Sequence, residues 1–115
     1  MGHEMTSPAN YPLTIRVGDT ETISLVMTDA TGPINITGRS YAAQIRSTAS
    51  STTTIAAFTC AIVNAAAGTV TCTLPATTTA ALTPQTAAFD LQETNGTVVT
   101  TLLAGQVTIV QDVTR

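Results

Sequence analysis

Apolar and polar residues alternate at every second position in several short segments of this sequence. In residues 20–28, for example, Ile23, Leu25 and Met27 alternate with mostly hydroxyl-bearing side chains. A period of two is typical of a half-buried strand, because successive side chains of a strand point to opposite faces. Thr, Val and Ile are also frequent, and their branching at Cβ favours strands. The pattern therefore predicts an all-β fold.

The predicted strands are short and follow one another closely. They occupy residues 12–17, 20–28, 39–47, 87–93, 98–103 and 105–113, in addition to a hairpin over residues 55–75. Turn residues separate them, including Asp29–Pro33 and the Asn95-Gly96 pair, which is a strong hairpin signal. Gly105 is expected to mark a bulge or a change of sheet, and residues 77–82 to form one helical turn. The arrangement predicts an immunoglobulin-like antiparallel β-sandwich of about seven to eight strands.

The length of 115 residues suits one domain. The first ten residues contain Gly2, Ser7 and Pro8 and show no hydrophobic periodicity. We therefore expect residues 1–10 to form a flexible N-terminal arm and residues 11–115 to form the sandwich.

The hairpin over residues 55–75 has a predicted register. Apolar residues share one parity on each side of a loop that is centred on Ala66. Cross-strand pairing places such residues on a common face. The symmetry pairs Ile62 with Val70, Cys60 with Cys72, and Phe58 with Leu74.

Charge and hydropathy exclude several classes of partner. The net charge is −3 and the four arginines are scattered, whereas nucleic-acid binding needs clustered Lys and Arg. No apolar run reaches the roughly 20 residues of a membrane span, and the N-terminus resembles no signal peptide. Charged residues make up only 10 % of the chain. Either neighbours in an assembly cover much of its surface, or hydroxyl groups alone keep it soluble.

Groups that could perform catalysis are few. The single histidine, His3, lies in the predicted arm, where nothing would hold it against a substrate. Asp90 and Glu93 could pair with Arg46 or Arg39 across the sandwich, but no carboxylates cluster as in a metal site. With no Trp and two Tyr, the chain also lacks an aromatic platform for stacking sugars. We predict no enzyme activity, no cofactor, and no catalytic, cofactor-binding or metal-binding residues.

Cys60 and Cys72 are the only thiols. The hairpin register places them opposite each other, within reach of a disulfide. Cytosolic thiols stay reduced, however, and no export signal is visible. The sequence therefore favours two buried thiols that pack as small hydrophobic groups, with a disulfide as the alternative.

The order of several short motifs resembles that of small immunoglobulin-like proteins and domains of tailed-bacteriophage particles. The resemblance covers about residues 13–115, and the order of the motifs is more specific than any one of them. The motifs are Arg16-Val17-Gly18-Asp19-Thr20, Ile36-Thr37-Gly38, Tyr41-Ala42-Ala43-Gln44-Ile45-Arg46, Gly68-Thr69-Val70, Thr79-Ala80-Ala81-Leu82, Phe89-Asp90-Leu91-Gln92, Leu102-Leu103-Ala104-Gly105-Gln106-Val107 and Asp112-Val113-Thr114-Arg115.

The resemblance implies a non-enzymatic virion structural protein that is assembled in the host cytoplasm. Some such domains anchor receptor-binding machinery in baseplates, and others are capsid cement or decoration proteins. The chain stops at Arg115 without receptor-linking segments, which favours the decoration role. The expected partners are the major capsid protein, or tail and baseplate proteins for an adaptor, and further copies of the chain as a trimer. A secreted bacterial adhesion module is the alternative from another class, and a disulfide would favour it.

Overall fold

The structure is a computed structural model that describes residues 9–113. Its elements in chain order are β1 (Ala9–Asn10), β2 (Leu13–Arg16), β3 (Glu21–Val26), β4 (Thr28–Asp29), β5 (Gly32–Pro33), β6 (Ser40–Arg46), β7 (Thr54–Ala57), β8 (Thr59–Asn64), β9 (Thr69–Leu74), α1 (Ala76–Thr79), β10 (Gln85–Asn95) and β11 (Val98–Val110). The predicted helical turn is thus confirmed between Pro75 and Pro84, although α1 begins one residue earlier and ends three residues earlier than the predicted range 77–82.

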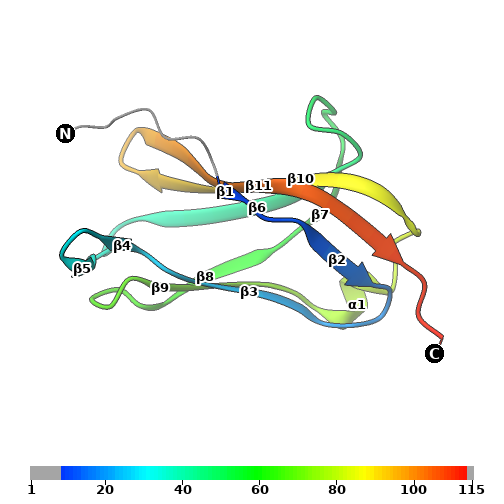
Figure 1. The fold of residues 1–115 in the computed structure, drawn as a ribbon, viewed down its shortest axis with the longest axis horizontal. Coiled ribbons are helices and arrows are strands. Elements are labelled where there is room, and N and C mark those ends of the chain that lie inside the picture. The colour runs from blue at the N-terminus through cyan, green and yellow to red at the C-terminus, as the bar shows by residue number, and fades with distance from the viewer. Residues whose placement is uncertain (1–8, 114–115) are drawn as a thin grey trace.

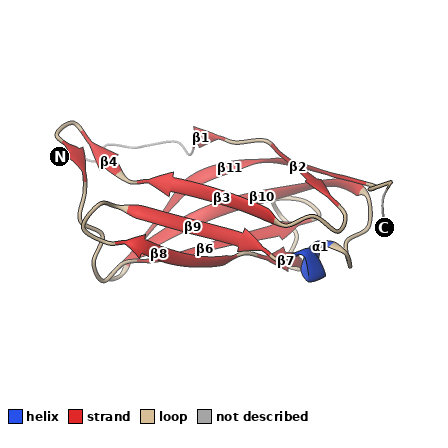
Figure 2. Ribbon diagram, turned by 90° about the horizontal axis from the view of Figure 1, so that it is seen from below, coloured by secondary structure: helices blue, strands red, loops and turns tan. Residues whose placement is uncertain are grey.

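Two layers of strands form the sandwich (Figure 1). The larger sheet has the order β1-β11-β10-β6-β7, with β2 also paired to β11, and the smaller sheet has the order β3-β9-β8. Figure 2, seen from below, shows the smaller sheet in front of the larger one. β1 and β2 run parallel to β11, and the long neighbouring strands run antiparallel. Counting β1 and β2 as one interrupted strand and setting aside the short β4–β5 hairpin, eight strands of residues 9–113 build the sandwich. The predicted immunoglobulin-like fold class is confirmed.

The core consists of aliphatic side chains from the inner faces of both sheets. Ile23, Ile45, Leu74 and Leu91 are almost fully buried between the layers, and Phe58 and Phe89 lie nearby with ring centroids 6.4 Å apart. These residues occupy alternate strand positions, as the period of two predicted.

The hairpin register is confirmed for two of its three predicted pairs. Cys60 lies opposite Cys72, and Ile62 lies opposite Val70. The third pair is wrong, because the backbone N–H of Phe58 donates to the larger sheet, at Ala43. The chain crosses between the sheets at this residue, so that β7 belongs to one layer and β8 to the other.

The Asn95-Gly96 hairpin joins β10 to β11. Asn95 pairs with Val98, so Gly96 is the first of two loop residues, and its φ is +65°. Glycine adopts this left-handed conformation without a steric penalty. The strand that follows is continuous rather than split in two, and Val113 lies beyond its end and is exposed.

The expected role of Gly105 as a bulge or sheet change is wrong. The register shift falls near Leu102 instead, because Leu91 pairs with Leu103 and Gln92 pairs with Thr101. Gly105 continues β11 without interruption, and a Cβ atom there would collide with the carbonyl of Tyr11. The glycine therefore allows the segment between β1 and β2 to run alongside β11 at close range.

Most of the predicted arm, residues 1–8, lies outside the described residues. Ala9 and Asn10 differ from the prediction, because they pair with Leu103 and Ala104 of β11. The backbone N–H of Tyr11 also donates to the carbonyl of Ala104. These contacts tie residues 9–11 to the sandwich.

Candidate functional site

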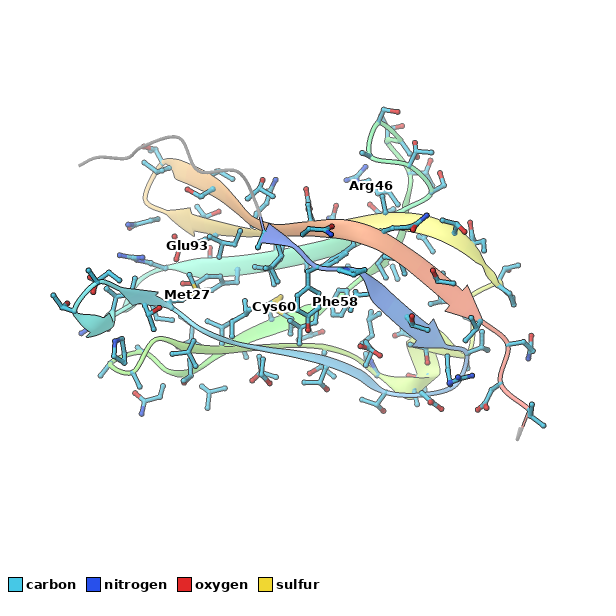
Figure 3. The ribbon with its side chains drawn as sticks, viewed as in Figure 1. Met27, Arg46, Phe58, Cys60 and Glu93 are labelled. Atoms are coloured by element: carbon cyan, nitrogen blue, oxygen red, sulfur yellow. A yellow bond between two sulfur atoms is a disulfide. The ribbon has the colours of Figure 1, made fainter. Side chains whose placement is uncertain are left out.

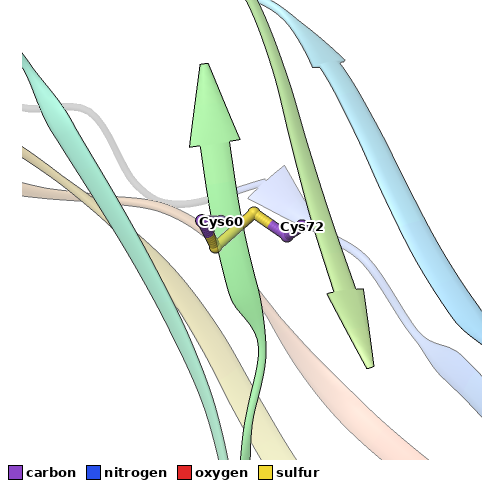
Figure 4. Close-up of a disulfide and its surroundings, with 2 residues drawn as sticks. All are labelled: Cys60 and Cys72. Atoms are coloured by element: carbon purple, nitrogen blue, oxygen red, sulfur yellow. A yellow bond between two sulfur atoms is a disulfide. The ribbon is translucent and has the colours of Figure 1, made fainter. Parts of the chain in front are cut away.

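Cys60 and Cys72 form a disulfide between the neighbouring strands β8 and β9 (Figure 4). The expectation of two free thiols is therefore wrong. Their Cα atoms lie 4.0 Å apart because the register pairs them directly. The expectation of free thiols rested on the reducing chemistry of the cytosol, which has no bearing on this geometry. Immunoglobulin domains of antibodies usually link their two sheets by a disulfide packed on a Trp. This bond instead lies within the smaller sheet, and the chain has no Trp.

A polar cluster lies on the inner side of the larger sheet, toward one end of the sandwich. The Tyr41 hydroxyl donates a 2.6 Å hydrogen bond to Oε2 of Glu93, and the Arg39 guanidinium lies 3.3 Å from the same oxygen. Glu93 is only 9 % exposed. Burial raises the pKa of the Tyr41 phenol, and the hydrogen bond and charge of Glu93 raise it further. The predicted pairing of Glu93 with Arg39 is confirmed, although it lies along the larger sheet, beside the neighbouring strands β6 and β10, rather than across the sandwich.

The outer face of the larger sheet contains a hollow beneath the loop of residues 47–53. Its volume is about 140 Å³, and its lining includes Gln44, Arg46, Thr48, Ala88, Asp90 and Ala104. Figure 3 shows Arg46 on this outer face at the base of the raised loop, with Phe58 and Cys60 on the opposite, inner side.

Arg46 is held in place within this hollow. One terminal nitrogen donates to the carbonyl of Ser51 at 2.9 Å, and the other donates to Oε1 of Gln44 at 2.7 Å. The carboxylate of Asp90, in contrast, makes no hydrogen bond or ion pair with any residue of 9–113. Its predicted pairing with Arg46 or Arg39 is therefore absent from this part of the chain, and half-buried Asp90 is one of the residues that line the hollow.

The outer face of the smaller sheet has a different chemistry, and we call it the threonine-rich face. It consists of Thr22, Ser24, Val26, Thr59, Ala61, Val63, Thr69, Thr71 and Thr73. None of these residues is charged. Val26 and Val63 are 57 % and 67 % exposed at one end of the face.

Sequence reasoning did not identify either surface as a site. The alternation in β6 and β10 places Gln44, Arg46 and Asp90 opposite the buried residues, which was a usable signal for their shared face. The hollow itself also needs the raised loop and the hydrogen bonds of Arg46, which no local pattern predicts.

No metal centre is visible among residues 9–113, because no three His, Cys, Asp or Glu side chains there are close enough to hold an ion. His3 lies outside the described residues. Within that same part of the chain, no helix is long and apolar enough to cross a membrane.

No protein-family model and no curated protein matches this sequence. A solved structure from a study of the multimeric cell-adhesive interactions of VGSC beta subunits has a similar fold. It aligns over 95 % of this chain and 98 % of its own, with a TM-score of 0.51 and 8 % sequence identity. Identity this low supports the fold alone.

Proposed function

We propose that this chain is a non-enzymatic structural protein of a tailed-bacteriophage particle, a cement or decoration protein that binds the major capsid protein of the head shell. The threonine-rich face carries the proposal. Soluble proteins normally keep mixed charges on their surfaces, yet this face has none and exposes Val26 and Val63. Such a face suits a permanent contact with a neighbouring protein. The motif order of the sequence supports the same assignment.

The proposed mechanism is mechanical. Each copy buries its threonine-rich face on the shell, and removal of its methyl groups from water stabilises the contact. Hydroxyl groups at the interface pair with the partner or with bridging waters. A trimer would match the local threefold positions of the shell by shared symmetry. The protein is then part of the virion, assembled in the host cytoplasm, with neither nucleic acid nor membrane as a partner.

The first test is antibody labelling of intact phage particles in the electron microscope. Label over the head supports the decoration role. Label at the tail end would contradict it and would indicate a tail or baseplate adaptor with the same fold.

A sharper test adds purified protein to particles that lack it and counts the bound copies. Thr71 lies at the centre of the threonine-rich face, opposite Ser24 and Ala61. We expect Thr71→Glu to abolish binding, because it buries an unpaired charge in the contact. Thr108→Glu is the matched control, since Thr108 is exposed on the outer side of the larger sheet. Equal binding by both variants would rule out this face as the contact.

The disulfide favours a second candidate, a secreted bacterial adhesion module. Disulfides persist mainly in oxidising compartments, such as the extracellular space and the bacterial periplasm. The two candidates differ in when Cys60 and Cys72 become oxidised. An exported module acquires the bond during export, whereas a virion protein holds thiols until the particle leaves the cell. Alkylation of thiols in unlysed producing cells, read by mass spectrometry, separates the two: modified thiols support the virion protein, and blocked cysteines support the adhesion module.

A further inference from the structure

We propose that the hollow beneath residues 47–53 binds one ring of a neutral sugar. This inference goes beyond the proposed function, because the hollow lies on the opposite outer face from the threonine-rich face. It starts from an unused group: Asp90 lies half-buried on the central strand β10, and its carboxylate has no hydrogen-bond or ion-pair partner among residues 9–113. Convergent polar groups in a hollow are the usual mark of a binding site.

The positions of the hydrogen-bonding groups in the hollow are set by the fold. Arg46 and Gln44 are fixed by their mutual hydrogen bond, and Arg46 is also tied to the loop at Ser51. Gln92, in an adjoining part of the same surface, donates its amide to Thr101. A ligand therefore meets donors and acceptors that are already in place, which reduces the entropy lost on binding.

The mixture of charges in the hollow selects against ions. An anion attracted by Arg46 would meet the carboxylate of Asp90, and a cation attracted by Asp90 would meet Arg46. A hydroxyl group both donates and accepts a hydrogen bond. Neighbouring hydroxyls on one ring can donate to Asp90 and accept from Arg46 or Gln44. The chemistry of the hollow thus favours a neutral ligand with adjacent hydroxyl groups.

The volume of the hollow and the side chains that form its floor suit a single sugar ring. The volume of about 140 Å³ is below the range of about 300–1,000 Å³ that holds drug-sized ligands. An adjoining hollow of about 290 Å³ shares Gln44, Arg46 and Asp90 with it. Ala88 and Ala104 form part of the lining of the smaller hollow, and their short side chains leave room for the C–H face of a ring. Phe89 is also part of the lining, but its side chain is buried in the core and only 4 % exposed. Because no aromatic ring is then available to stack on the ligand, we expect a weak Kd of about 1–10 mM. Many copies on one particle would raise the effective affinity.

The test is a titration of the whole chain by amide NMR with methyl glycosides of glucose, mannose, galactose and N-acetylglucosamine. We expect saturable shifts at residues 44–49 and 88–90 with at least one of these probes. Methyl glycosides mimic the terminal residue of a glycan, and the corresponding reducing sugars represent free sugar. Tighter binding of a methyl glycoside than of its reducing sugar indicates a glycan as the source of the ligand, and the reverse indicates free sugar.

Two variants and two ionic probes make the proposal falsifiable. Asp90→Ala should weaken binding at least tenfold, and Ala104→Leu should abolish it by filling the hollow. Thr86→Ala, on the same face of β10 but outside the hollow, is the matched control and should bind as the unaltered chain does. The proposal is overturned if no glycoside shifts these amides, if sulfate or methylammonium shifts them more strongly, or if Asp90→Ala binds normally. Because the assay uses the isolated chain, its failure leaves the capsid proposal untouched.

Discussion

Tyr41 and Glu93 are cross-strand partners on β6 and β10, and the phenol of one donates a 2.6 Å hydrogen bond to the carboxylate of the other. Both side chains point to the inner side of the larger sheet, where a lone carboxylate would be costly. Arg39 supplies the compensating charge at 3.3 Å from the same oxygen. The pair therefore closes one end of the sandwich with satisfied polar groups in place of apolar packing.

Removal of the Tyr41 hydroxyl should destabilise the domain. Hydrogen bonds to charged groups contribute about 1.5–3 kcal/mol, and we expect Tyr41→Phe to lower the free energy of unfolding by that amount in urea denaturation. Tyr11→Phe is the control, because the Tyr11 hydroxyl has no hydrogen bond to any described residue. Equal stability of the two variants would mean that the Tyr41 bond contributes nothing.

The charge of Glu21 should reduce stability at neutral pH. Burial raises the pKa of this carboxyl above its ordinary value, and nearby Asp19 raises it further. The folded state thus holds the proton more tightly than the unfolded chain, so stability is lost as pH rises through the folded pKa. Glu21→Gln should be more stable than the unaltered chain at pH 7, and this gain should disappear below the ordinary Glu pKa.

Asp29 provides a control of opposite sign for that experiment. The hydrogen bonds from the side chain and backbone of Thr31 hold its pKa below the ordinary value. This stabilisation is present above the ordinary pKa and is lost as pH falls through the lowered one. Asp29→Asn should therefore be less stable at pH 7, with the difference vanishing in acid. Thermal melts across the pH range would contradict both assignments if the two variants shifted in the same direction.

Leu74 tests the register of β9 within the core. Its side chain is fully buried, and truncation of a buried Leu to Ala costs about 2–5 kcal/mol. We expect Leu74→Ala to lose stability in this range. Val63→Ala, at a position that is 67 % exposed, should change stability by less than about 0.5 kcal/mol. A Leu74→Ala variant that melts with the unaltered chain would show that this side chain lies outside the core.

The disulfide should stabilise the folded chain chiefly by restricting the unfolded one. The two cysteines are 12 residues apart, and closing a ring of this size contributes about 3 kcal/mol in the chain-entropy treatment. Dithiothreitol should therefore lower the melting temperature of the unaltered chain. The double variant Cys60→Ala/Cys72→Ala should already melt lower and should not respond to the reductant. A response in that variant would point to an effect unrelated to the bond.

Local patterns predicted most of the fold, because the period of two identifies which residues face the core. Ile23, Cys72 and Leu91 were placed correctly by alternation alone. The crossing between sheets at Phe58 was missed, since no Gly or Pro marks it and it depends on a hydrogen bond to Ala43. Long-range partners, rather than local sequence, determine where a strand changes sheet.

The two candidate surfaces were only partly predictable for the same reason. Alternation places Gln44 and Asp90 on one outer face, and the threonines of β9 on another. The direction in which Arg46 turns could not be predicted, because it depends on the loop carbonyl of Ser51. The disulfide was misjudged for a different reason. The register correctly placed the two cysteines opposite each other, but the preference for free thiols rested on an assumed reducing compartment, which the fold does not determine.

Gly105 offers the strictest test of how the N-terminal strands are attached. A Cβ atom at this position would meet the backbone of Tyr11 and Pro12, which cannot yield as a flexible side chain can. Gly105→Ala should therefore displace the segment between β1 and β2 and destabilise the domain by about 1–3 kcal/mol, as overpacking does. Amide exchange should accelerate at Tyr11, whose N–H bonds to Ala104.

Gly18→Ala is the control, since its Cβ would meet nothing within 4 Å, although its φ of +92° adds local backbone strain. That strain should not change exchange at Tyr11. Accelerated exchange at Tyr11 in both variants would mean that the close approach at Gly105 is not what holds this segment in place.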